Sequence, residues 1–374
     1  MKKNLRNILA LGLGLMTSVT FAQTWDVDSR TRIDMIGDEN MGLEDRMITS
    51  QRATLGVSWE GSNWGIYSST VVNYNFQDLN TASLSVYEAY ASMDLMGFAY
   101  ATMGRQALNY GSGMIIGSNE WGAIRNTRDG FTFGLDLDMA DITVGYDNVN
   151  TGSSMIEYVE GTDIYAGNYM YVNASRNSGN LSANLLYVTT ENNDGDYTED
   201  LMGLDLGYSM MDGDLMINAM YNTASSDLLD DMDMTMIGAT YTVSDNMSIS
   251  ASQTTYGDGG FAVFGGNYGL NGVDAAGNLY NSWIQNGNLG YLGANDQNMS
   301  IGGTYSTSGF DLGFTMHTIT NENDDSYERN VTEISVGYDM SDNASLSLMM
   351  ATDDNQYGDM QEYTYTYLTL TVTP

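Results

Sequence analysis

Arginine is the residue of this chain best suited to binding an anion, and its distribution is uneven. The nine that follow residue 22, with no lysine among them, are Arg30, Arg32, Arg46, Arg52, Arg105, Arg125, Arg128, Arg176 and Arg329. A guanidinium group binds a carboxylate through two parallel hydrogen bonds, and a confined one needs acidic partners. Glu88, Glu120 and Asp129 are the candidate partners. Together with Arg30, Arg32, Arg52, Arg105, Arg125 and Arg128 they are the residues expected at a pore constriction or in a lumen.

The overall charge is strongly negative. Loss of residues 1–22 would remove three of the twelve basic residues and none of the 48 acidic ones, which leaves a net charge of −39. A surface of this sign excludes sequence-independent binding to nucleic acids, which needs a basic face. It also disfavours any strongly anionic partner.

Catalytic chemistry has few candidates here. Cysteine is absent and His317 is the only histidine, so no Ser–His or Cys–His arrangement is specified. Paired carboxylates such as Asp230 and Asp231 could do acid–base work, but no pattern around them indicates it. We therefore expect no enzymatic activity and no cofactor.

The elements that must position these side chains are strands. Apolar and polar residues alternate with a period of two, as in Ala239, Tyr241 and Val243 against Thr240 and Thr242. Eighteen such segments occur, many of ten or more residues, whereas strands of soluble proteins average about five or six. The predicted strands are 24–36, 47–59, 64–75, 83–95, 98–106, 131–138, 141–149, 164–176, 180–190, 200–210, 214–223, 232–243, 247–257, 298–307, 310–320, 330–340, 344–352 and 360–373.

The separators alternate between tight turns and longer polar loops. Turns rich in Gly, Asn and Asp, such as 177–179 and 244–246, alternate with the loops 37–46, 76–82, 107–130, 150–163, 191–199, 224–231, 258–297, 321–329 and 353–359. This rhythm is typical of a transmembrane antiparallel up-and-down β-barrel, with short periplasmic turns and long extracellular loops. An even number of strands puts both termini at the short-turn end. A soluble β-sandwich or β-solenoid is the structural alternative.

The apolar faces of these strands need a cover, and no helical pattern offers one. Membrane lipid is the expected cover, with the polar faces lining an aqueous interior. Residues 1–22 have the basic start, apolar run and small-residue end of a secretory signal peptide, so residues 23–374 are expected as one barrel domain in the outer membrane of a Gram-negative bacterium. The 27 tyrosines and 5 tryptophans suit aromatic girdles, and Tyr363, Tyr365 and Tyr367 form one candidate run on a single face.

Strand parity assigns the arginines to a face. With Trp25, Val27, Leu55 and Val57 toward lipid, Arg30, Arg32 and Arg52 point into the lumen. With Phe98 and Tyr100 toward lipid, Arg105 does so too, and parity with Phe314 and Met316 turns His317 inward. We hypothesise that loop 107–130 folds into the barrel and forms a constriction with these four arginines. The alternative role of the arginines is only to hold the loop by salt bridges.

Segment 104–131 also carries a family resemblance. Gly104-Arg105-Gln106, Tyr110-Gly111, Ile115-Ile116-Gly117, Trp121, Arg128 and Asp129-Gly130 are similar to a pattern in the alginate-export family of outer-membrane barrels. The resemblance implies an eighteen-stranded barrel that conducts a saccharide. A net charge of −39 would repel a polyuronate, however, and argues against alginate as the cargo.

Acidic residues gather in the predicted loops and could bind cations. Clusters lie at 191–196, 227–233, 322–325 and 353–354, but no twelve-residue calcium-loop pattern occurs. Loosely bound Ca²⁺, bridging loops or lipopolysaccharide phosphates, is the expected form of cation binding. Loop 258–297 is rich in Gly, Asn and aromatic residues, and the sequence does not say whether it fills the pore or binds a partner.

Together these features predict an outer-membrane porin, a passive diffusion channel for small hydrophilic solutes and ions, with cations preferred overall. One alternative is a non-conducting barrel that has a structural or partner-binding role in an envelope complex, and another is a substrate-specific saccharide channel. Outer-membrane lipid and lipopolysaccharide are the expected surroundings, and a homo-oligomer or an envelope protein partner is compatible with the sequence.

Overall fold

The computed structural model describes most of the chain after residue 22. The described residues are 23–38, 46–76, 78–118, 120, 125–147, 158–159, 162–163, 168–191, 198–226, 231–261, 292–355 and 362–373. The predicted signal peptide, 1–22, and most of loop 258–297 lie outside them.

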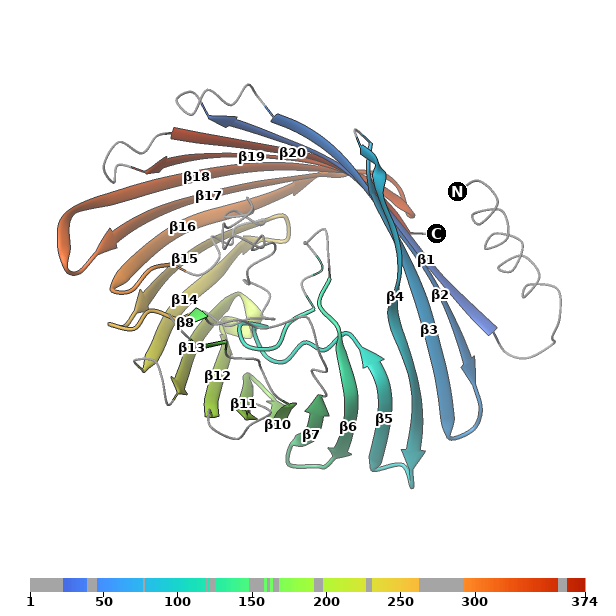
Figure 1. Ribbon diagram of the computed structural model, residues 1–374. Helices are drawn as coiled ribbons and strands as arrows, with labels where there is room; N and C mark the ends of the chain where they lie inside the picture. Colours follow the sequence, from blue (N-terminus) through green and yellow to red (C-terminus); the bar gives the residue numbers. More distant parts are fainter. Residues whose placement is uncertain are drawn as a thin grey trace.

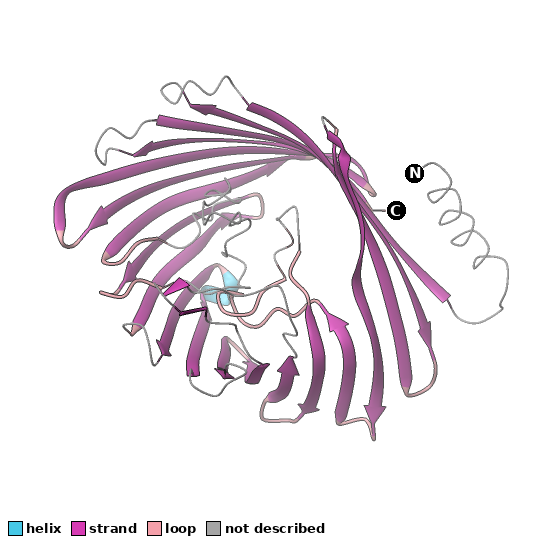
Figure 2. Ribbon diagram, viewed as in Figure 1, coloured by secondary structure: helices cyan, strands magenta, loops and turns pink. Residues whose placement is uncertain are grey.

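Strands make up nearly all of the described chain (Figures 1 and 2). They are β1 (Gln23–Asp38), β2 (Arg46–Glu60), β3 (Trp64–Asn75), β4 (Asp78–Leu95), β5 (Ala99–Gln106), β6 (Arg128–Asp136), β7 (Asp141–Asp147), β8 (Tyr158–Val159), β9 (Thr162–Asp163), β10 (Asn168–Ser178), β11 (Leu181–Glu191), β12 (Thr198–Met210), β13 (Leu215–Ser226), β14 (Met232–Ser244), β15 (Met247–Tyr256), β16 (Asp296–Thr307), β17 (Phe310–Asn321), β18 (Asp324–Ser341), β19 (Ala344–Asn355) and β20 (Glu362–Val372). A single 3₁₀ turn, Met211–Gly213, is the helical element of this part, and no described helix is long and apolar enough to cross a membrane.

Eighteen of the strands form one closed antiparallel sheet. Each pairs with its sequence neighbours, β7 pairs with β10, and β1 pairs with β20 from Ser29↔Val372 to Asp38↔Tyr363. The two short strands β8 and β9 pair only with each other. The sheet therefore has no free edge, which is the condition for placing strands in lipid. The prediction of an eighteen-stranded barrel is confirmed.

The outer surface is apolar because the strands alternate as the sequence predicts. In β14, β15 and β16, the side chains of Ile237, Ile249 and Ile301 are each close to half exposed or more. Their neighbours Ser252 and Ser300, on the opposite face, hydrogen-bond to each other at 2.6 Å. In a globular protein such exposure of apolar groups would be costly, whereas against acyl chains it is the stable arrangement.

Aromatic residues ring both ends of the outer surface. At the tight-turn end the exposed rings are those of Trp64, Tyr208, Tyr241, Tyr305, Phe310 and Tyr338, and at the loop end those of Tyr74, Phe131, Tyr187 and Tyr221. The girdle proposed for the last strand is wrong. Tyr365 and Tyr367 are buried at 3% and 2% exposure on the lumen side, because they pair with Ile36 and Asp34 on the face that carries Arg32.

The predicted tight turns lie at one end of the barrel, together with the ends of β1 and β20. Gly179 and Gly309 supply positive φ angles of 58° and 83°, which two-residue connections of this kind require. At the other end, the predicted loop 321–329 is a two-residue turn at 322–323, and β18 begins at Asp324. Acidic residues obscure the alternation over 324–329, which is why the sequence indicated a loop there.

Candidate pore constriction

The connection between β5 and β6 runs across the inside of the barrel (Figure 1). Its described residues are 107–118, 120 and 125–127, and they contact walls on opposite sides of the lumen. We call this segment the inner loop. Its inward fold is the geometry that the sequence hypothesis requires.

The inner loop has its own backbone framework. The amide of Tyr110 donates to the carbonyl of Ile116 at 3.1 Å, and the amide of Gly113 donates to that of Tyr110 at 2.9 Å. Further on, the amide of Asn126 donates to the carbonyl of Ser118 at 2.7 Å. Burial raises the pKa of Tyr110 to about 12, so its hydroxyl stays protonated at neutral pH. The backbone hydrogen bonds show that the inner loop is folded and not extended.

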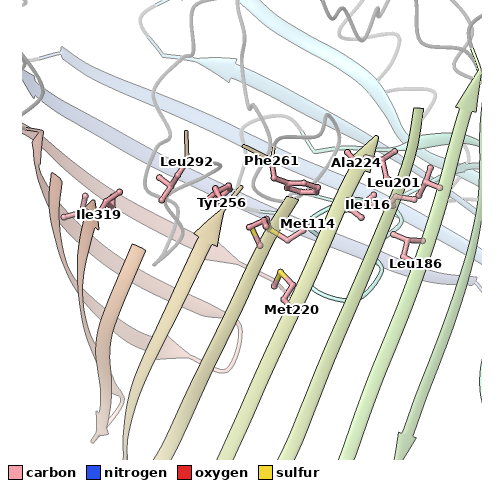
Figure 3. Packing of buried hydrophobic residues seen from close by; sticks show 14 of the residues in the cluster. Met114, Ile116, Leu186, Leu201, Met220, Ala224, Tyr256, Phe261, Leu292 and Ile319 are labelled. Carbon is pink, nitrogen blue, oxygen red and sulfur yellow. The ribbon is translucent and has the colours of Figure 1, made fainter. Parts of the chain in front are cut away.

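An apolar contact fixes the inner loop to the wall formed by β10 to β14. Met114, Ile115 and Ile116 are 1% to 4% exposed and belong to one buried cluster with side chains of that wall. Figure 3 shows Met114 and Ile116 beside wall residues such as Leu186, Leu201 and Met220. Three well-buried apolar side chains contribute about 1.5–3 kcal/mol each to holding the loop in place.

A polar contact lies next to this apolar one. The amide of Ser112 donates to Asp205 Oδ2 at 3.1 Å. Gly111 has a φ of +57°, and a Cβ there would lie 2.0 Å from Asp205 Oδ2 and 2.7 Å from Asn184 Nδ2. Only glycine lets the loop backbone approach the wall this closely.

The opposite wall holds the inner loop through arginines. The backbone carbonyl of Glu120 accepts hydrogen bonds from Arg52 Nη1 at 2.9 Å and from Arg30 Nη1 at 3.1 Å. Both arginine side chains are buried against the lumen side of β1 and β2. Side chains from two strands of the wall therefore donate hydrogen bonds to one peptide group of the loop.

The Glu120 carboxylate gathers a second set of contacts. It accepts a hydrogen bond from the Tyr87 hydroxyl at 2.8 Å and forms an ion pair with Arg125 Nη1 at 3.2 Å. Arg125 also donates to Thr54 Oγ1 at 2.6 Å, and its guanidinium lies 3.5 Å from the centre of the Tyr87 ring. Stacking and charge pairing together fix the orientation of this guanidinium.

A β-bulge in β4 brings two neighbouring residues to the lumen. The register between β3 and β4 shifts between Ser68 and Thr70, where the amide of Glu88 donates to Ser69 Oγ at 3.1 Å. Tyr87 then reaches Glu120, while Glu88 Oε1 accepts the amide of Ala107, the first residue of the inner loop, at 3.0 Å. Simple alternation would send one of these two side chains into lipid.

The remaining lumen arginines have their own partners. Arg32 pairs with Asp34 at 2.7 Å and lies 5.7 Å from the centre of the Tyr367 ring. Arg128 pairs with Asp147 at 3.3 Å. Arg30, Arg32, Arg52 and Arg125, which we call the arginine cluster, lie near three acids, Asp28, Asp34 and Glu120.

The lumen positions expected for Arg105 and Asp129 are wrong. Arg105 pairs with Asp129 through bonds of 2.7 and 2.6 Å on the face that also carries Met103 and Phe131, both exposed outward. Tyr100, expected toward lipid, instead lies on the lumen side, where its hydroxyl is 3.2 Å from Thr143 Oγ1. The parity assignment was wrong because it placed the Tyr100 ring toward lipid. Gly134, opposite Tyr100, leaves room for this ring inside the barrel.

A second polar cluster, which sequence reasoning missed, lines β16 to β19. Arg329 and Asp353 form a bidentate ion pair at 2.7 and 2.6 Å, and both are at most 6% exposed. His317, which the structure places on the lumen side, accepts a hydrogen bond at Nδ1 from Asn298 Nδ2 at 3.2 Å. Inward parity could have found Arg329, but the sequence placed it in a loop.

Among the described residues, no three or more His, Asp or Glu side chains are grouped so as to hold a metal ion. Part of the acidic clusters, including 192–197 and 227–230, lies outside the described residues. Loose Ca²⁺ binding by these loops stays a prediction. Asp353 is not part of a cation site, since it pairs with Arg329.

The comparisons with known proteins bear on the fold. No protein-family model matches the chain, and no curated protein matches its sequence. Solved structures do resemble it: Pseudomonas aeruginosa OpdQ (13% identity, TM-score 0.71, 94% of this chain and 97% of that one) and OpdL (12%, 0.71, 94% and 99%). P. aeruginosa OpdK, solved with vanillate, resembles it at 11% identity with a TM-score of 0.68 over 94% and 98% of the two chains.

These similarities show that the fold of this barrel is shared with solved structures over nearly the whole chain. The resemblance of segment 104–131 to the alginate-export family is not supported by the comparisons. Two motif residues have a structural explanation instead. Gly104 has a φ of 129° at close contact with Ala89, and Gly111 lies against Asp205.

Proposed function

We propose that this protein is an outer-membrane channel through which small hydrophilic solutes and ions diffuse passively. The barrel supplies a polar interior shielded from lipid, and the inner loop narrows it. Diffusion through a fixed constriction needs no catalytic group and no cofactor.

The observation that carries this proposal is the double attachment of the inner loop. Apolar side chains hold it to β10–β14, and arginines hold it to β1–β2, so it crosses the lumen without detaching from either wall. A loop anchored on both sides restricts the opening to a defined size, which is how porins set a limit on solute size.

Charge at the constriction adds selectivity. The four guanidinium groups of the arginine cluster lie together on one wall of a strongly acidic protein, beside the carboxylates of Asp28, Asp34 and Glu120 and within electrostatic range of Glu88. We propose that the acidic remainder favours cations overall, while the cluster is where an anionic group of a solute would bind. OpdK, a barrel of the same fold, was solved with vanillate, a carboxylate.

Planar-bilayer recordings test the proposal. The purified protein should conduct in KCl, and its reversal potential in a salt gradient should show a cation preference. Arg52→Ala should increase that preference and alter conductance, because it removes a positive charge that faces the constriction.

Arg105→Ala is the matched control. It removes the same side chain from the outer face of the barrel and should leave both quantities unchanged. Equal effects of the two substitutions would contradict the assigned roles. Absence of current, together with liposomes that do not swell in small sugars, would favour the alternative of a non-conducting structural barrel.

A further inference from the structure

A hollow of about 400 Å³ opens in the lumen wall beside the inner loop. Its roof is formed by Gly111 and Ser112, and its floor by β10 to β14. Pockets that hold small molecules are about 300–1,000 Å³ in volume. The hollow is therefore large enough for one small solute together with a few water molecules.

The lining of this hollow is rich in hydroxyl and amide groups. Besides Ser112 of the inner loop, six polar side chains of the wall contribute: Ser175, Asn177, Ser182, Asn184, Asp205 and Asn218. The register of the sheet puts all of them on the lumen face, since Ser175 pairs with Asn184, Asn184 with Asp205, and Gly207 with Asn218. The gathering is thus a property of the wall and does not depend on a single rotamer.

The charge of the lining limits what can bind. Asp205 is the one charged residue among the described residues that line the hollow, and no arginine reaches it. An anionic group would meet a carboxylate without a compensating base. The hollow thus differs in chemistry from the arginine cluster on the opposite wall.

Two further features favour a ring that carries hydroxyl groups. Ser and Asn side chains both donate and accept, which matches hydroxyl groups that do the same. The apolar side chains of Met220 and Met236 also line the hollow and offer a surface to the C–H groups of a ring. Asn184 Nδ2 and Asp205 Oδ1 are themselves buried below the surface of the described wall, so a solute in the hollow would contact the other hydroxyl and amide groups.

We infer that this hollow is a binding site for a neutral, polyhydroxylated solute of the size of a monosaccharide. The site deepens the proposed function, on which it rests for solute access through the lumen. A solute of this class would bind transiently beside the constriction before passing it.

Calorimetry on the detergent-solubilised full-length barrel tests binding without requiring conduction. D-glucose is the probe, and D-glucuronate and D-glucosamine carry the same ring with a negative or a positive charge. Weak binding of D-glucose, and binding of D-glucuronate at least several-fold weaker, is the expected result. No binding of D-glucose, or binding of D-glucosamine alone, would overturn the assignment to a neutral solute.

Variants locate the site. The double variant Ser175→Ala and Asn218→Ala removes two polar groups for which the structure shows no contact with the inner loop, and should weaken D-glucose binding roughly 5- to 50-fold. Ser250→Ala is the control, because Ser250 lies on the same lumen face outside the hollow. Equal affinity of both variants and the native protein would overturn the location.

Conductance separates the two proposals. If the native protein conducts and D-glucose neither binds nor reduces the current, the proposed binding site is refuted and the proposed channel function is retained. If D-glucose binds and the variants weaken binding as expected, but no current flows, the proposed binding site is supported and the proposed channel function is refuted.

Discussion

The Glu120 carboxylate offers the sharpest test of how the inner loop is held. It accepts one bond from the Tyr87 hydroxyl at 2.8 Å and one from Arg125 at 3.2 Å. Glu120→Gln keeps the shape of the side chain and removes its charge. The backbone carbonyl that Arg30 and Arg52 contact is unaffected by the change.

The magnitude follows from these two bonds. A hydrogen bond to a charged group contributes about 1 kcal/mol more than a neutral one, so two such bonds would lose about 2 kcal/mol. The Glu120 side chain is 56% exposed, and solvent screening reduces the loss to about 1 kcal/mol. That corresponds to about a fivefold shift away from the docked loop.

Selectivity should change in the same variant. One of the acids beside the arginine cluster becomes neutral, so the net charge at the constriction becomes more positive. Single-channel recordings in a KCl gradient should show a reversal potential shifted toward that of chloride, together with more frequent fluctuations of the open current.

Glu60→Gln is the control, since Glu60 is exposed at the far end of β2. It removes the same charge at a distance from the inner loop. If Glu120→Gln and Glu60→Gln give the same reversal potential and the same current noise as the native protein, the carboxylate does not act at the constriction.

Three further substitutions probe the framework. Arg329→Ala leaves the Asp353 carboxylate buried without its partner, and should destabilise the barrel by about 3–5 kcal/mol, seen as a lower temperature of the heat-induced gel shift; an unchanged temperature would contradict the buried ion pair. Gly145→Val adds a Cβ that would lie 1.9 Å from the Tyr171 ring, and should lower folding yield from urea, whereas unchanged refolding would show that the ring moves freely. Gly111→Ala is strained by a φ of +57° and overlaps the Asp205 carboxylate, so it should raise the frequency of current fluctuations; a quiet current would show that this contact does not hold the loop.

The sequence was sufficient for the architecture because the pattern repeats eighteen times. Alternation over ten or more residues, as in β3 (Trp64–Asn75), leaves little freedom in register once one face must meet lipid. Failures occurred where a local feature interrupts the alternation. The segment 324–329 is one case, because its acidic residues resemble a loop.

The candidate constriction was predictable only in part, because only some of its residues lie in regularly alternating strands. Arg30 and Arg52 sit in regular strands, so parity placed them on the lumen side. Arg105 was misplaced because Tyr100 occupies space above Gly134 inside the barrel, and no rule of alternation reports that space. The hollow under Gly111 could not be predicted, since it depends on which wall the inner loop contacts.

The proposed channel function requires that the inner loop narrows an open, water-filled barrel. The clearest experiment compares the single-channel conductance of the native protein with that of a variant in which residues 111–118 are replaced by a shorter Gly-Ser linker. We predict that both conduct, and that the variant has the larger conductance and admits larger neutral solutes. Equal conductance in the two proteins, or no conductance in either, would refute the proposed role of the loop.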